Sequence, residues 1–131
     1  MLAAFKNAHA IGVEVHQARF EVTRWLINRM DKQWHLSNRV ELQRTSILDV
    51  SLPPASVDVV FMDTNHLYPD DFEFIMYLTT SGILRQGFVF IGDDPLHTGT
   101  NLARQRFIAE HSARYQIVTK PAKNLWWFLA R

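Results

Sequence analysis

The sequence lacks cysteine altogether and has little glycine, with 5 glycines in 131 residues. Without cysteine the chain has no disulfide and no thiolate metal ligand, which fits a reducing compartment. Its apolar runs are much shorter than the ~20 residues that cross a bilayer. The opening stretch MLAAFKNAHA contains Lys6 and has no signal-peptide core. We therefore expect a cytoplasmic protein that has no membrane partner.

An excess of charge of one sign is also missing. The 14 Lys and Arg residues nearly balance the 13 Asp and Glu residues, which gives a formal net charge of +1. Such a chain has no strong electrostatic attraction to nucleic acid or anionic lipid. Trp126 and Trp127 are adjacent on an expected strand, so their rings face opposite sides, and no basic groove accompanies them. We expect no nucleic-acid partner.

Short β-rich runs alternate with helical periods along the chain. Strands are expected at 10–15, 39–43, 57–63, 88–94, 115–120 and 125–130; helices at 16–32, 69–80 and 100–113; the tail of a helix at 2–8; and a loop at 45–56. Strands rich in Val, Ile and Phe and separated by helices predict an α/β fold, a mostly parallel sheet with helices on both faces. The short link at 121–124 forces the last two strands to be antiparallel.

Acidic residues and histidines end two of these strands. Asp63 and His66 close the run at 57–63, and Asp93, Asp94 and His97 close the run at 88–94. If the two strands run side by side in one direction, their tips converge where open α/β sheets bind ligands. Asp70 and Asp71 are expected only to favour the start of the helix at 69–80 through its dipole.

The order of these segments resembles class I S-adenosylmethionine-dependent methyltransferases. AIGVEV (10–15) resembles the strand whose terminal acid holds the cofactor ribose, here Glu14, because a carboxylate accepts hydrogen bonds from two vicinal hydroxyls. RTSILDVSLPPASVDVVFMD (44–63) resembles the loop that cups adenine and the next strand, and GILRQGFVFIGDD (82–94) resembles the turn and strand after that. The resemblance implies a Rossmann-like sheet with an antiparallel C-terminal strand. It also implies S-adenosylmethionine as cofactor, bound by Glu14, Ser46, Ile47 and Asp63.

A narrower resemblance follows from Asp-x-x-His-x-Tyr at 63–68 and Asp-Asp at 93–94. These motifs are similar to those of cation-dependent O-methyltransferases of small molecules and sugars. The resemblance implies a small-molecule acceptor and Mg²⁺ held by Asp63, Asp93 and Asp94, since Mg²⁺ prefers oxygen ligands. His97, or else His66, would take the proton of the acceptor hydroxyl.

The family's glycine-rich first strand and turn have no counterpart, because the nearest glycine, Gly12, lies inside a strand. We therefore expect a single partial domain over 1–131, truncated before residue 1. Direct pairing of the flanking strands, a rearranged sheet, or a homodimer or strand-swapped assembly would compensate. Three functions stay open: an O-methyltransferase, a degenerate fold acting as a non-catalytic binding or dimerisation module, and a hydroxylase-like relative.

Overall fold

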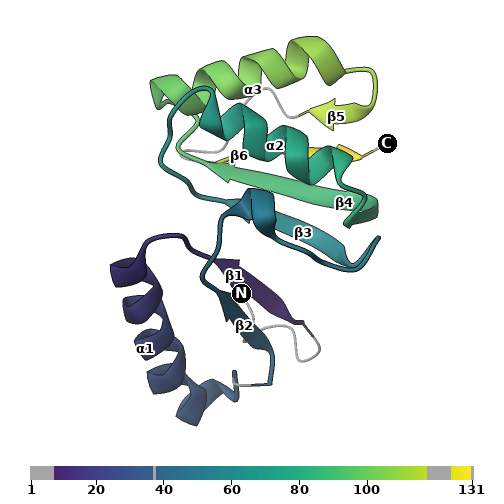
Figure 1. Ribbon diagram of the computed structural model, residues 1–131. Coiled ribbons are helices and arrows are strands. Elements are labelled where there is room, and N and C mark those ends of the chain that lie inside the picture. Colours follow the sequence, from purple (N-terminus) through teal and green to yellow (C-terminus); the bar gives the residue numbers. More distant parts are fainter. Residues whose placement is uncertain (1–7, 37, 118–124, 131) are drawn as a thin grey trace. The chain divides into compact units, whose positions relative to one another are not determined.

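The computed structural model describes residues 8–36, 38–117 and 125–130. The elements follow one another as β1 (Ala10–Val13), α1 (Gln17–Trp34), β2 (Val40–Gln43), the 3₁₀ turn η2 (Ile47–Asp49), β3 (Val57–Met62), α2 (Asp70–Thr80), β4 (Leu84–Asp93), α3 (Thr98–His111), β5 (Tyr115–Ile117) and β6 (Leu125–Ala130) (Figure 1). The chain divides into two compact units, Met1–Val50 and Ser51–Arg131. None of the described helices is long and apolar enough to cross a membrane.

The first unit is a parallel strand pair joined by a long helix. β1 and β2 pair from Ala10↔Val40 to Val13↔Gln43. α1 runs for 18 residues without glycine or proline and ends where His35 adopts a left-handed conformation with φ of 49°. Of the helix tail predicted at 2–8, all but residue 8 lies outside the described residues, as do residues 118–120 of the strand predicted at 115–120 and the link at 121–124.

The second unit is a four-stranded sheet in the order β3-β4-β6-β5. β3 and β4 are parallel, and Met62 pairs with Gly92, so Asp63 and Asp93 follow at the same end. β6 runs antiparallel to both β4 and β5. The predicted α/β fold, with its mostly parallel strands and its antiparallel C-terminal strand, is thereby confirmed. The predicted parallel pairing of strands 57–63 and 88–94 is confirmed as well.

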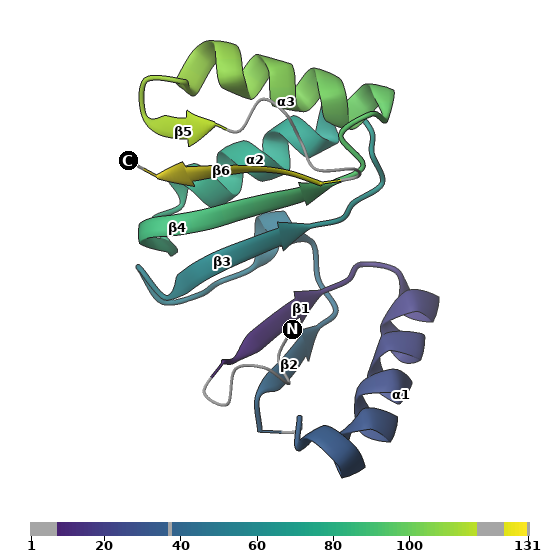
Figure 2. The same ribbon diagram turned by 180° about the vertical axis from the view of Figure 1, so that it is seen from behind.

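The core of this unit is an aromatic layer on one face of the sheet. The rings of Phe90 on β4 and Phe128 on β6 stack with centroids 4.7 Å apart, and Phe107 of α3 lies 4.8 Å from Phe128. Ile75 of α2 is fully buried. Figure 2 shows the sheet from behind, with its strands in front of α2. Helices of this unit therefore cover the aromatic face.

Candidate active site

Four of the sequence-predicted residues come together at the carboxyl ends of β3 and β4. The Nε2 atom of His66 lies 3.7 Å from Asp63 Oδ1 and 3.5 Å from Asp94 Oδ2. The ring of His97 lies 5.1 Å from the ring of His66, centroid to centroid. Asp93 is the last residue of β4 and pairs with Leu125 in the sheet. Two carboxylates and two imidazoles thus share one end of the parallel strand pair.

The backbone at this end of the sheet turns sharply. His66 and Asp94 have positive φ angles of 59° and 45°, in the left-handed region that Asp and His adopt more readily than most residues. Gly99, in the first turn of α3, packs against the loop after β3, and a Cβ there would lie 2.0 Å from the carbonyl oxygen of His66. Only glycine allows this close approach of α3 to the loop.

A buried hydrogen-bond network lies beneath His66. Asp71 is 0% exposed, and its two carboxylate oxygens accept hydrogen bonds from the hydroxyls of Thr64 and Thr100. The distance from Thr100 Oγ1 to Asp71 Oδ2 is 2.8 Å. Thr100 Oγ1 also lies 3.2 Å from His66 Nδ1. The imidazole is therefore linked through one hydroxyl to a buried carboxylate.

Sequence reasoning missed Thr64, Asp71 and Thr100. Asp71 contributes to the start of α2, as expected, but its carboxylate is buried in the network. A signal was available in the topology: Asp71 and Thr100 lie in the first turns of α2 and α3. These helices follow β3 and β4, so their first turns lie near the carboxyl ends of the strands.

The loop between β3 and α2 is also tied to α3 through Arg106. Its Nη1 donates to Tyr68 Oη at 2.9 Å, and its Cζ lies 4.0 Å above the ring of Phe72. Hydrogen bonds to Glu110 and Tyr68 raise the pKa of Arg106 above its ordinary value. The guanidinium stays charged and joins the loop to the middle of α3.

The predicted magnesium ligands do not form a metal site. Asp63, Asp93 and Asp94 all belong to the described part of the chain, and within that part no three His, Asp or Glu side chains are placed to hold a metal ion. The carboxylates of Asp63 and Asp94 face His66 instead. As they are placed, these residues do not fit the ion.

The predicted cofactor residues of the first unit lie at one end of its strand pair. Glu14 directly follows β1, is partly exposed, and accepts a hydrogen bond at Oε1 from the backbone N–H of His16 at 2.7 Å. Ser46 follows β2 and caps η2, its hydroxyl accepting from Leu48 N at 3.2 Å, and Ile47 begins that turn. Within the described residues, Glu14 Oε2 has no hydrogen-bond partner. The role of Glu14 towards the cofactor ribose stays a prediction.

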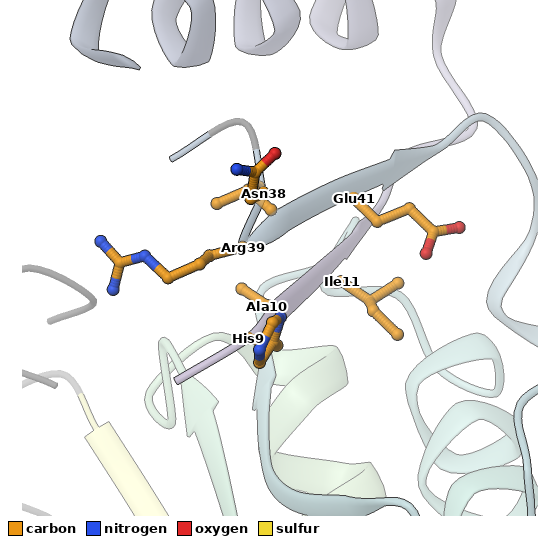
Figure 3. A pocket seen from close by; sticks show the side chains of 7 residues that line it. His9, Ala10, Ile11, Asn38, Arg39 and Glu41 are labelled. Atoms are coloured by element: carbon orange, nitrogen blue, oxygen red, sulfur yellow. The ribbon is translucent and has the colours of Figure 1, made fainter. Parts of the chain in front are cut away.

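A hollow of about 240 Å³ lies at the other end of the same strands, lined by residues 9–11 and 38–41 (Figure 3). Ligand pockets are usually larger, about 300–1,000 Å³. The hollow is formed by the starts of β1 and β2, whereas Glu14 and Ser46 follow their ends. It is therefore distinct from the predicted cofactor site.

Several solved structures have an architecture similar to that of this chain. A Staphylococcus aureus protein named as a caffeoyl-CoA O-methyltransferase matches 99% of the chain with a TM-score of 0.77 and 11% identity. The cofactor-bound protein Rv0187 from MTB matches 99% with a TM-score of 0.73 and 20% identity. A SAM-dependent O-methyltransferase from Thermotoga maritima matches 98% with a TM-score of 0.68 and 15% identity.

The chain has a methyltransferase fold. It spans 68%, 66% and 53% of those three proteins, so each of them contains further segments without a counterpart here. No protein-family model and no curated protein matches the sequence. Within this methyltransferase fold, the cluster around His66 lies at the carboxyl ends of parallel strands, where such folds bind ligands.

Proposed function

We propose that the chain forms the greater part of an S-adenosylmethionine-dependent O-methyltransferase that acts on a small hydroxylated acceptor. The observation that carries this proposal is the placement of His66 Nε2 between the carboxylates of Asp63 and Asp94, at the ligand-binding end of a methyltransferase fold. A partly exposed imidazole of this kind suits proton removal from a hydroxyl.

His66, Asp63 and Asp94 have different roles in the proposed reaction. When bound, the cofactor supplies an electrophilic methyl group on a sulfonium. His66 Nε2 accepts the hydroxyl proton as the acceptor oxygen bonds to the methyl carbon and the sulfur–methyl bond breaks. Asp63 and Asp94 then form ion pairs with the resulting imidazolium.

The base proposed here is His66, whereas the sequence-based expectation placed His97 before His66. His97 is exposed at the N-cap of α3 and its side chain makes no capping hydrogen bond. His66 is partly buried and has a partner group at each ring nitrogen. A held imidazole is the better base because its geometry is set before the acceptor binds. We assign His97 to the acceptor side of the site.

Calorimetric titration with S-adenosylmethionine tests the proposal. We expect binding with a dissociation constant on the order of micromolar, weakened about 10–100-fold in Glu14→Ala, which removes hydrogen bonds to a charged acceptor. Glu21→Ala is the matched control, because Glu21 is a partly exposed glutamate of the same unit that pairs with Arg24 on α1. No heat at millimolar cofactor would contradict the proposal.

A second candidate function is a non-catalytic binding or dimerisation module. Val59 and Phe61 are 48% and 54% exposed on β3, which ends the four-stranded sheet formed by the described residues. Exposed apolar edge strands invite pairing with another chain. A second copy of this chain, pairing along β3 in a homodimer or swapped assembly, would cover these side chains. Absence of cofactor binding in a stable dimer would select this function.

A further inference from the structure

The hydrogen bonds beneath His66 bear on which ring nitrogen carries its proton. The Thr100 hydroxyl has a single hydrogen, and it donates that hydrogen to Asp71 Oδ2 at 2.8 Å. Towards His66 Nδ1, at 3.2 Å, Thr100 Oγ1 then has only lone pairs to offer. A hydrogen bond at that contact then requires the proton to be on Nδ1.

We infer that Asp71 and Thr100 are positioning residues that hold neutral His66 as the Nδ1–H tautomer, against the carboxylates of Asp63 and Asp94, which lie 3.7 and 3.5 Å from Nε2 and by themselves favour a proton there. A neutral imidazole carries one N–H, so a proton on Nδ1 leaves Nε2 as an acceptor. The ring orientation and the tautomer are then set by the protein before any ligand arrives.

The surroundings of Asp71 make this arrangement stable. Asp71 and Thr100 are 0% and 1% exposed, so water does not compete for their hydrogen bonds. The second carboxylate oxygen is already taken by the hydroxyl of Thr64. A buried carboxylate is costly unless its oxygens accept hydrogen bonds, which favours donation by both hydroxyls rather than by neither.

The loop that carries His66 is fixed on the same side. The backbone N–H of Asp71 donates to Leu67 O at 2.9 Å, and Gly99 packs against the backbone of His66. These contacts hold the backbone from which the His66 ring extends. The tautomer is therefore a property of the folded second unit, independent of any bound group.

The significance of the tautomer rests on the proposed function. Methyl transfer to a hydroxyl needs a proton acceptor that faces the substrate side, and the Nδ1–H form presents Nε2 there. The opposite tautomer would direct an N–H at the acceptor hydroxyl and could not remove its proton. Asp71 and Thr100 would thus act on the reaction without touching the substrate.

Nitrogen-15 NMR of the full chain tests the inference without cofactor or acceptor. In spectra recorded at alkaline pH, where the ring is neutral, we expect His66 Nδ1 in the protonated range and Nε2 in the unprotonated range. Thr100→Val removes the acceptor and should shift the Nδ1 signal towards the unprotonated range. Thr100→Ser keeps the hydroxyl and should restore the parent spectrum.

Asp71→Asn is an independent test of the His66 tautomer. Its amide can donate to Thr100 Oγ1, which would free the hydroxyl hydrogen for Nδ1 and convert His66 to the Nε2–H form. Thr98→Val, an exposed change in the same turn of α3, is the control that should leave both signals in place. An Nε2–H tautomer in the parent chain, or an unchanged tautomer in folded Thr100→Val, would overturn the inference. Because these readings need no cofactor, failure of S-adenosylmethionine binding would count against the proposed function alone.

Discussion

Among single residues, Gly99 is under the most severe steric constraint near the site. An added Cβ would lie 2.0 Å from His66 O and 2.8 Å from Tyr68 N, both backbone atoms that cannot turn aside as a side chain can. The same residue lies in a helix, where replacing glycine by alanine ordinarily stabilises by up to about 1 kcal/mol. The two effects oppose each other, and the steric one is the larger because the backbone must move.

We expect Gly99→Ala to lower the free energy of unfolding by about 1–3 kcal/mol, the usual cost of overpacking. Urea denaturation followed by circular dichroism measures it. Thr98→Ala, an exposed change one position earlier in α3, should stay within about 0.5 kcal/mol of the parent. Equal stability of the two variants would show that the loop yields to the added methyl group.

The residues that follow the strands can be predicted from the sequence, whereas the buried hydrogen-bond network beneath His66 cannot. Asp63, His66 and Asp94 follow apolar strands, and parallel pairing is enough to bring them together. The bond between Thr100 and Asp71 joins residues 29 positions apart, on two different helices. No local pattern encodes such a pairing, because it depends on how α2 and α3 dock on the sheet.

At the scale of elements, the sheet of the second unit has two unlike faces. Phe90, Trp126 and Phe128 are at most 1% exposed beneath the helices. Phe61 on β3 is 54% exposed, although it lies in a strand as apolar as the others. Burial of an aromatic side chain stabilises in proportion to the area removed from water, so the two faces contribute very differently.

Phe128→Ala should cost about 3–5 kcal/mol of unfolding free energy, since it leaves a cavity among stacked rings. Phe61→Ala should change that free energy by about 0.5 kcal/mol or less. Chemical denaturation of both variants under one set of conditions gives the comparison. A large loss in Phe61→Ala would mean that another surface covers this ring in solution.

Element boundaries were predictable where apolar periodicity was strong and less so elsewhere. α1 and β6 lie within two residues of the expected ranges. β4 begins at Leu84, four residues before the expected start, because Arg85, Gln86 and Gly87 do not read as a strand. The pairing with β3 is irregular between Val57 and Val59, and Gly87 has a φ of 81°. A strand that opens with polar residues and a left-handed glycine has no clear signature in sequence.

At the scale of the whole molecule, the strands fall into two separate sheets. Within the first unit β1 pairs with β2, and within the second unit β3 pairs with β4. The prediction of one partial domain over 1–131 stays a prediction. Assembly of two copies is one of the compensations expected from the sequence, and solution experiments address it directly.

Sedimentation velocity should show a dimer if β3 pairs with a second copy. Phe61→Arg places a charge on the exposed strand and should shift the species to a monomer. Leu96→Arg adds the same charge at a loop residue that is 85% exposed and should leave the dimer intact. A parent chain that sediments as a monomer at high concentration would exclude this assembly.

Most of the predicted cofactor residues and the His66 network lie in different stretches of the gene. Glu14, Ser46 and Ile47 belong to the first unit, whereas Asp63 and the His66 network belong to the second. Under the proposed function, most of donor recognition is then mutable separately from base catalysis, and Asp63 serves both. Selection on acceptor chemistry can proceed through codons 64–100 while the codons of Glu14, Ser46 and Ile47 stay constant. Laboratory evolution of new acceptors should accordingly concentrate its libraries on that downstream stretch.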